Sequence, residues 1–221
     1  DAAIAATPHI AQSFLPRAVP VVHNYPILSE WSQASDDSAR YASRQLCYIG
    51  SITRERGLTQ LIKAIESVDC TLHLAGSYEP GEYRDELTAQ PGWQKVIEYG
   101  YVNREAANSI FNQCALGVVL FDHSPNHLYS LSTKMFEYMA AGLPILVSDL
   151  PANVQLLSDS RCGVFVNPSD IQEISAKLSA MLETPSDLEA MGKRGQELVR
   201  TRLNWDSELS TYLDIYRKIL S

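Results

Sequence analysis

The sequence predicts an α/β fold in which a parallel β-sheet is covered by helices on both faces. Short apolar runs alternate with helical stretches of about ten to fifteen residues, a pattern typical of consecutive βαβ units. Hydrophobic residues make up 45% and charged residues 20% of the 221, an ordinary composition for a globular domain. Four runs are almost wholly apolar, as expected for central strands: residues 46–50, 71–75, 116–121 and 145–148.

The region before these strands has a different composition. Residues 2–6 and 19–23 are apolar, so we expect two short strands there. A Thr-Pro pair between them is a favourable N-cap and first helical residue, and it predicts a short helix over residues 8–14. Ser, Asp and Gln then dominate, and we expect a linker over residues 27–44.

The elements of the domain predicted over residues 45–221 follow from the same signals. Strands are expected at residues 46–50, 71–75, 95–99, 116–121, 145–148 and 163–166. Helices are expected at residues 57–67, 82–89, 103–113, 151–158, 171–182, 188–201 and 206–220, with one more between residues 130 and 142. Gly142 is placed to end that helix, and Pro144 prevents its continuation.

The net charge and the cysteine pattern disfavour several classes of protein. Lys and Arg total 18 against 26 Asp and Glu, a formal net charge of -8, which disfavours general binding to nucleic acid. The four cysteines form no Cys-x-x-Cys pair, so we expect reduced, mostly buried thiols in a cytosolic protein. No apolar run approaches the ~20 residues that span a membrane. The chain begins at the edge of an apparent strand, and we expect it to be part of something longer.

The loop after the first central strand is one candidate site, because it leaves a strand and enters a helix at Gly57. Ligands of parallel sheets bind at this end of the strands, where helix N-termini offer unpaired N–H groups. Arg56, with Arg54 as a second candidate, would hold a diphosphate through its forked donors. The open alternative is a solvated loop in which both arginines flank Glu55. The loop is neither GxGxxG nor GxxxxGK[ST], so it supports neither a dinucleotide fold nor an NTPase.

A second candidate site runs from Ser130 to Glu137, at the start of a predicted helix. The backbone N–H groups of Ser132 and Thr133 would hold a phosphate, and Lys134 would add a positive charge. Glu137, about one turn into the helix, would accept hydrogen bonds from vicinal hydroxyls such as those of a ribose. The open alternative is a capped surface helix with a Lys134–Glu137 pair. Two such loops at one edge of one sheet support each other as halves of a single site.

A third candidate is Gly100-Tyr101-Val102, just past a predicted strand. A glycine at a strand end lets a flat ring approach the backbone, and Tyr101 would stack on a base or a sugar. The open alternative is that Tyr101 is half-buried and serves only packing.

The histidines show no catalytic or metal-binding pattern. His123 and His127 lie beside Asp122, but Pro125 prevents the two histidines from sharing a helix face. We expect a polar loop there and no metal. His73 lies in an apolar strand and is expected to be a core or edge histidine. No Ser/His/Asp or Cys/His arrangement is discernible.

Several segments occur in the order seen in glycosyltransferases of the GT-B fold. They are Tyr48-Ile49-Gly50-Ser51 through Arg56-Gly57-Leu58, Leu72-His73-Leu74-Ala75-Gly76, Gly100-Tyr101-Val102, and Lys134-Met135-Phe136-Glu137-Tyr138-Met139-Ala140-Ala141-Gly142-Leu143-Pro144. Over residues 46–221 the chain resembles the C-terminal, donor-binding domain of the retaining family called glycosyltransferases group 1. The resemblance implies a Rossmann-like sheet that faces an acceptor-binding N-terminal domain across a cleft. Residues 1–26 then resemble the remnant of that domain with its interdomain segment.

The resemblance also implies roles for the candidate residues. Positions matched to nucleotide contacts are Gly50, Ser51, Arg56, Tyr101, Val102, Ser132, Thr133 and Glu137. Among them, Arg56 and the backbone at Ser132 and Thr133 would contact the diphosphate. Glu137 matches the second glutamate of a Glu-x7-Glu motif, which binds the ribose, and Tyr101-Val102 match the segment that lines the base. Arg56 and Lys134 are the candidate catalytic residues, as cations that stabilise the leaving diphosphate.

Two positions depart from the family pattern. The first glutamate of the motif, which helps to engage the donor sugar, falls at Tyr129, and Ser51 stands where many members carry arginine. A subset of the family with a Lys-x-x-Glu-Tyr core lacks that glutamate too, and this chain resembles the subset. The class of sugar therefore stays open.

The activity implied by the resemblance is that of a retaining hexosyltransferase of polysaccharide biosynthesis. The donor would be a UDP- or GDP-linked sugar, the acceptor a saccharide or lipid-linked molecule bound by the N-terminal domain, and no metal or other cofactor is expected. The isolated domain is expected to bind nucleotide weakly and to be inactive, and peripheral contact of a longer protein with the inner membrane face stays open. Two alternatives also stay open: a sugar-nucleotide epimerase of the same architecture, and a degenerate domain that serves interaction alone.

Overall fold

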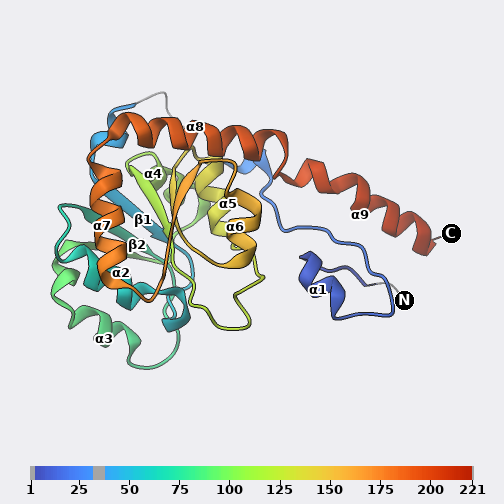
Figure 1. The fold of residues 1–221 in the computed structure, drawn as a ribbon, viewed down its shortest axis with the longest axis horizontal. Helices are drawn as coiled ribbons and strands as arrows, with labels where there is room; N and C mark the ends of the chain where they lie inside the picture. The colour runs from blue at the N-terminus through green and yellow to red at the C-terminus, as the bar shows by residue number, and fades with distance from the viewer. Residues whose placement is uncertain (1–2, 32–37, 221) are drawn as a thin grey trace.

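A six-stranded parallel sheet forms the centre of the structure, a computed structural model that describes residues 3–31 and 38–220. The strand order is β3-β2-β1-β4-β5-β6, and all neighbouring strands run parallel (Figure 1). The strands are β1 (Gln45–Ile49), β2 (Thr71–Ala75), β3 (Val96–Gly100), β4 (Leu116–Val119), β5 (Ile145–Ser148) and β6 (Gly163–Val166). The predicted α/β, Rossmann-like fold is confirmed, and the four apolar runs form the four inner strands.

Helices cover the two faces of this sheet and extend beyond it. They are α1 (Pro8–Gln12), α2 (Leu58–Ile65), α3 (Tyr83–Thr88), α4 (Arg104–Phe111), α5 (Thr133–Ala140), α6 (Pro151–Leu157), α7 (Ile171–Leu182), α8 (Pro185–Thr201) and α9 (Trp205–Leu220). Short 3-10 turns are η1 (Leu28–Glu30), η2 (Ser38–Ala42), η3 (Arg54–Arg56) and η4 (Pro91–Lys95). Figure 1 shows α8 crossing the domain and α9 continuing away from it.

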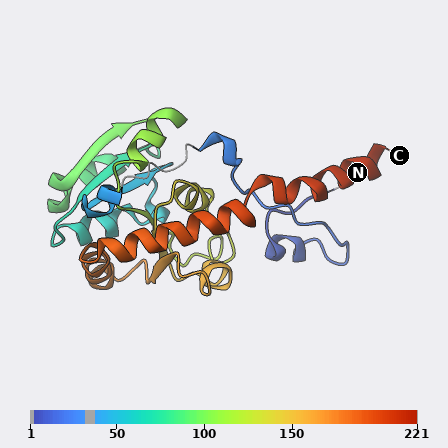
Figure 2. The same cartoon turned by 90° about the horizontal axis from the view of Figure 1, so that it is seen from above.

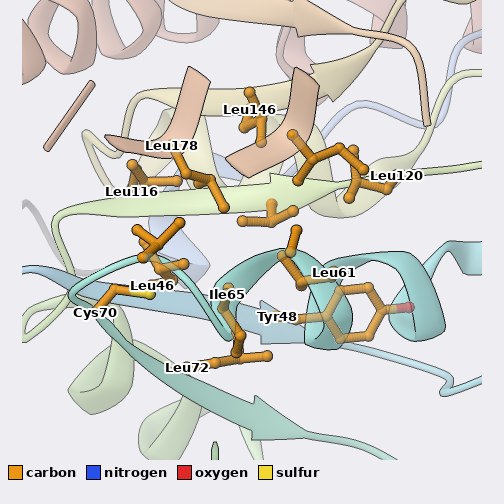
Figure 3. Packing of buried hydrophobic residues seen from close by; sticks show 14 of the residues in the cluster. Leu46, Tyr48, Leu61, Ile65, Cys70, Leu72, Leu116, Leu120, Leu146 and Leu178 are labelled. Carbon is orange, nitrogen blue, oxygen red and sulfur yellow. The ribbon is translucent and has the colours of Figure 1, made fainter. Parts of the chain in front are cut away.

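Helices α2 and α7 cover one face of the sheet. Leu61 and Ile65 of α2 and Leu178 of α7 lie in one buried cluster with the strand residues Leu46 and Leu116 (Figure 3). Full burial of an aliphatic side chain of this size contributes about 1.5–3 kcal/mol relative to exposure. This layer therefore holds β1 and β4 firmly, and the loops that follow these strands have fixed starting points.

Helix α5 is anchored to the other face of the sheet by Tyr138. The Tyr138 hydroxyl oxygen accepts a hydrogen bond from the Ile49 N–H at 2.9 Å, at the end of β1. The ring lies against β4, where a Cβ at Gly117 would stand 2.3 Å from Tyr138 Cδ2, so only glycine leaves it room. Phe111 of α4 meets the same ring edge-on, with the two centroids 5.4 Å apart. These contacts fix the start of α5 beside the carboxyl end of β1.

Most predicted elements occur close to their expected bounds. The ranges of β2, β5, β6 and α7 agree with the prediction, and each remaining strand or helix of the predicted domain is displaced by a few residues at most. The predicted cap of α4 is present, because the Asn103 side chain accepts a hydrogen bond from the Ala106 N–H at 2.9 Å. Local capping and apolar periodicity were sufficient signals for these elements.

The two strands predicted at residues 2–6 and 19–23 are wrong for the part of them that is described; residue 2 lies outside it. One isolated parallel bridge, between Ala5 and Val21, is all the pairing that these segments show. Two extended segments with no third strand beside them form too few ladder bonds for a stable sheet. The helix predicted between them is present as α1, with the Thr7 side chain accepting from the Ile10 N–H at 3.2 Å.

The segment before the domain lies along α9. The Trp205 N–H donates to the Pro26 carbonyl at 2.9 Å, and the His23 N–H donates to Glu208 Oε2 at 3.0 Å. Figures 1 and 2 both show α1 and α9 on the same side, away from the sheet. Among the described helices, none combines the length and apolarity needed to cross a membrane. The division into residues 1–26, 27–44 and 45–221 stays a prediction.

Candidate functional site

The two candidate loops, one after β1 and one between β4 and α5, meet at the carboxyl edge of the sheet. In the sheet, β1 lies between β2 and β4, so the strand order reverses direction at β1. Ligands of open α/β sheets bind at such a switch point. The Asp122 N–H donates to the Glu55 carbonyl at 3.0 Å. A Cβ at Gly57, whose φ is +69°, would stand 2.2 Å from the Leu120 carbonyl oxygen. The prediction that both loops share one edge is therefore correct.

Lys134 is buried where the two loops meet. Its side chain is 4% exposed, and Nζ lies 3.6 Å from the centre of the Tyr48 ring. A Cβ at Gly50 would stand 2.9 Å from Nζ, so a larger residue at the end of β1 would displace the amine. Among the described residues Nζ has no hydrogen-bond partner. The alternative of an exposed Lys134–Glu137 pair is wrong.

Burial dominates the electrostatics of this site. It lowers the pKa of Lys134 well below its ordinary value, and the neighbouring charge of Arg56 lowers this pKa further, against opposing effects of Glu137 and Cys47. Burial likewise raises the pKa of the half-buried Glu137, although Arg104 and Lys134 oppose the shift. The interior of the site is thus poorly solvated, and added negative charge there would be strongly felt.

Arg56 is the second cation of the site. Its guanidinium carbon lies 5.0 Å from the centre of the Phe121 ring, and no carboxylate of the described residues forms an ion pair with it. The adjoining loop is held by Tyr48, whose hydroxyl donates to the Ser51 carbonyl at 2.6 Å. Burial raises the pKa of Tyr48 above its ordinary value, which keeps the hydroxyl a donor, while Arg56 opposes that shift. Ser51 itself is exposed.

Arg54 does not join the site. Its guanidinium pairs with the carboxylates of Glu79 and Glu86 and lies over the Tyr83 ring, 4.6 Å from the centroid. The hypothesis of Arg54 as a second diphosphate ligand is not supported, because its donors already face two acceptors.

The start of α5 supplies backbone donors next to these cations. Ser132 is the buried N-cap residue, and the exposed Thr133 is the first residue of the helix. The first N–H groups of a helix lack intrahelical acceptors and carry the positive end of the helix dipole. Lys134, Ser132 and Thr133 thus form one cationic corner with the β1 loop.

The surroundings of Glu137 include residues that the sequence did not indicate. Arg104 of α4 pairs with Glu30 at 2.5 Å and lies over the Trp31 ring, 4.6 Å from its centroid. Among the neighbouring charges, that of Arg104 lowers the pKa of Glu137 the most. A lone tryptophan in an otherwise polar stretch was the available signal for this contact.

The third candidate segment ends β3 at the same edge. Gly100 has φ of +67°, and Val102 is half-buried against the apolar cluster of α4 and α5. Tyr101 is 82% exposed, so the alternative of a half-buried packing residue is wrong. β3 is two strands away from β1, so the carboxyl ends of these two strands lie about 10 Å apart along the sheet edge.

Tyr129, which replaces the first glutamate of the motif, contacts the segment before the domain. Its ring stacks on the ring of His9 in α1, with centroids 3.9 Å apart and an interplanar angle of 16°. A cavity of about 190 Å³ is lined by residues of both regions, among them Thr7 and Ser130. The position expected to engage a sugar therefore carries an aromatic contact.

The loop histidines form pairs. His127 Nδ1 lies 2.6 Å from Asp122 Oδ1, its ring stacks on Phe121, and His123 Nε2 lies 2.8 Å from Asp149 Oδ1. No cluster of three or more side chains suited to metal binding occurs in residues 3–31 and 38–220.

All four cysteines are free and buried, as predicted. His73 is buried too, between Tyr99 at 2.7 Å and Gln45 at 2.5 Å.

Comparison with known families agrees with this geometry. Residues 34–198 match the family described as glycosyl transferases group 1. The chain belongs to this family. It is 22% identical over 179 residues to an uncharacterized glycosyltransferase of Methanocaldococcus jannaschii, which covers 79% of the chain and 45% of that protein.

Two further similarities are informative for this family member. It is 25% identical over 191 residues to the GDP-mannose:cellobiosyl-diphosphopolyprenol alpha-mannosyltransferase of Xanthomonas campestris, covering 82% of the chain and 49% of that protein. The structure of Anabaena HepE in complex with UDP-glucose superposes with a TM-score of 0.80 at 15% identity, covering 98% of the chain and 64% of that protein. The chain thus spans about half the length of these curated relatives.

Proposed function

We propose that this chain is the donor-binding part of a retaining glycosyltransferase that uses a nucleotide-diphosphate sugar. The observation that carries the proposal is the cationic corner itself. Buried Lys134 without an acceptor, Arg56 without a described carboxylate, and the start of α5 converge at one edge of the sheet. No carboxylate of the described residues forms an ion pair with either cation, and a diphosphate would supply the negative charge and the hydrogen-bond acceptors that all three groups require.

The same groups serve the chemistry. When the bond between the sugar and the diphosphate breaks, negative charge develops on the leaving phosphate oxygens, and fixed cations lower the energy of that transition state. Arg56 contributes forked donors and Lys134 a point charge. Ser124 Oγ and Asp122 Oδ1 both contact the same ring nitrogen of His127, Nδ1, at 3.0 and 2.6 Å, whereas a nucleophilic triad uses the two ring nitrogens separately. Catalysis is therefore proposed to rest on stabilisation of the leaving group. Retention of configuration is proposed from the resemblance to the retaining family.

The remaining residues fit a nucleoside attached to that diphosphate. Glu137, one turn into α5, would accept hydrogen bonds from the ribose hydroxyls. Tyr101 is exposed just past the end of β3, which lies two strand spacings from β1, and a nucleoside spans such a separation. Gly50, Ser51 and Val102 are proposed to contact the nucleotide between the diphosphate and the base. UDP is the first donor nucleotide to test, since HepE holds UDP-glucose, and GDP is the second, since the Xanthomonas relative is named for GDP-mannose.

The acceptor is proposed to bind a domain beyond this chain. The curated relatives are about twice as long as the matched region, and the Xanthomonas enzyme is named for a lipid-linked acceptor. A saccharide or lipid-linked acceptor is therefore proposed for the longer protein, together with activity in polysaccharide biosynthesis. The chain alone is expected to bind nucleotide without turning it over.

Isothermal titration of the chain with UDP, GDP and ADP tests the nucleotide site. We expect binding of at least one nucleoside diphosphate and weaker binding of the same nucleotide by the Arg56→Ala variant. If none of the three bound, or if the variant bound as tightly as the native chain, the proposed site would be wrong. Product analysis of the longer protein, with NMR assignment of the anomeric configuration, then tests transfer and retention.

A further inference from the structure

We propose that Lys134 is uncharged while the site is empty and takes up a proton when a diphosphate binds. The inference rests on the proposed function, because the diphosphate is that of the nucleotide. In addition to the proposed function, we infer that binding of the diphosphate makes Lys134 a cation, so that the site then carries a second positive charge beside that of Arg56. Binding is then coupled to the net uptake of about one proton per diphosphate.

The enclosure of the amine is the first argument. The side chain is 4% exposed, and no described group accepts a hydrogen bond from Nζ. An ammonium has three donors, and burying it without acceptors is far more unfavourable than burying a neutral amine. The Tyr48 ring, 3.6 Å away, offers one aromatic face, which does not replace three hydrogen bonds. The backbone at Gly50 closes another side.

The charges that face the amine give the second argument. Arg56, on the loop after β1, opposes a second positive charge, whereas Glu137 on α5 favours one. The charge of Glu137 is itself disfavoured by burial and is shared with Arg104. Cys47 of β1 stays a neutral thiol, because burial raises its pKa well above the ordinary value. Among the described groups, Glu137 is thus a weak source of favourable charge, and burial together with Arg56 favours the neutral amine.

Two further hydroxyls near this pocket also stay neutral. Burial raises the pKa of Tyr48 and of Tyr138 above the ordinary value, so neither becomes an anion that pairs with the lysine. A diphosphate held by Arg56 and the start of α5 changes this balance, because it places anionic oxygens beside Nζ. An opposite charge within a few ångströms favours the ammonium form.

A consequence for affinity follows from this coupling. In the pH range where the empty site holds the neutral amine and the occupied site the ammonium, affinity falls about tenfold for each unit by which the pH rises. The Lys134→Met variant, which lacks the amine, should not show this dependence of affinity on pH.

NMR of the lysine side chains is the first test, and its first measurement, on the free chain, needs no nucleotide. The chain has six lysines, so selective 13C labelling at Cε gives few signals, and Lys134→Met identifies the relevant one. At pH 7.5 we expect this signal at the neutral-amine position, and we expect saturation with UDP to move it to the ammonium position. A charged Lys134 in the free chain would overturn the inference whatever the nucleotide does.

Calorimetry at pH 8 in buffers of different ionisation enthalpy is the second test. The terminal phosphate of UDP, with a pKa of about 6, is then ionised and contributes little to the proton balance. We expect uptake of about one proton by the native chain and about none by Lys134→Met. Lys63→Met, which removes an exposed lysine of α2, is the matched control and should retain the uptake.

The two proposals fail differently. Binding of UDP without proton uptake would overturn the inference and leave the nucleotide site standing. Absence of binding by UDP, GDP and ADP would overturn the proposed function and the coupling with it. An unfolded Lys134→Met chain would be recognised by circular dichroism, and Lys134→Gln, which is polar and uncharged, would then replace it with the same expected loss of uptake.

Discussion

Three pairs of like residues differ in whether their polar groups find partners within the chain. Arg54 pairs with two carboxylates, whereas Arg56, two residues on, pairs with none that is described. Lys95 donates to three backbone carbonyls at 2.6–3.0 Å, whereas Nζ of Lys134 has no acceptor. The partnered member of each pair serves the fold, and the unpartnered member is available to a ligand.

The third pair shows the same contrast in aromatic residues. The Tyr99 hydroxyl lies 2.7 Å from His73 Nδ1, whereas Tyr101 is 82% exposed and makes no described ring or hydrogen-bond contact. Residue type alone does not separate these pairs, since each contains the same amino acid. The difference lies in the tertiary surroundings. Substitution of both members of a pair therefore separates contributions to folding from contributions to binding.

The arginine pair gives the largest expected difference in affinity. Arg56→Ala should weaken UDP binding about 10- to 100-fold, because hydrogen bonds to a charged group contribute about 1.5–3 kcal/mol. Arg54→Ala should change it less than about twofold, since its partners are Glu79 and Glu86 at an exposed position. Titration calorimetry of both variants measures this. Equal losses in the two would show that the ion pairs of Arg54 hold the loop in its binding shape.

The lysine pair should change stability in opposite directions. Lys134→Met removes a buried amine without acceptors and should raise the free energy of unfolding by about 1–3 kcal/mol. Lys95→Met leaves the carbonyls of Ile65, Glu66 and Val68, at the end of α2, without their donor. It should lower the free energy of unfolding by a similar ~1–3 kcal/mol. Urea denaturation of the chain without nucleotide tests both, and destabilisation by Lys134→Met would contradict the assignment of Lys134 to a ligand.

The sequence predicted the fold better than it predicted the environment of these residues. Inner strands are apolar on both faces, so β1, β2, β4 and β5 were visible as short runs. The burial of Lys134 was not visible, because lysine is almost always exposed and its pocket depends on Gly50 approaching from another segment.

The contact of residues 28–31 with α4 was not predicted for a similar reason. The stretch reads as a polar linker, and its anchoring by Trp31 and Arg104 depends on two segments far apart in the sequence. The arginines of the β1 loop were likewise indistinguishable, since the partners of Arg54 come from the region after β2. Local patterns specify elements, whereas the ionic surroundings of a residue are set by segments that fold against it.

The lysine pair also predicts a pH dependence of stability. Folding lowers the pKa of Lys134, so between the lowered value and the ordinary value near 10.5 the unfolded chain binds more protons than the folded chain. The contribution of Lys134 to the free energy of unfolding of the native chain therefore rises with pH across that window, by at most about 1.4 kcal/mol per pH unit. The advantage of Lys134→Met over the native chain should accordingly shrink as the pH approaches 10.5. Urea titrations at several pH values measure it, and a constant difference would mean that Lys134 is charged in the folded chain.

The tyrosine pair gives the smallest expected effect. Tyr101→Ala should weaken UDP binding about 2- to 10-fold, because one aromatic contact contributes about 0.5–1.5 kcal/mol, and Tyr101→Phe should retain native affinity because the ring alone makes the contact. Tyr99→Ala should leave affinity unchanged and lower stability, since its hydroxyl serves His73 within the sheet. Titration with UDP and with pyrophosphate, which lacks a base, separates the effects. A loss for both ligands on substitution of Tyr101 would place the residue outside the base site, whereas a loss confined to UDP assigns it to the nucleoside.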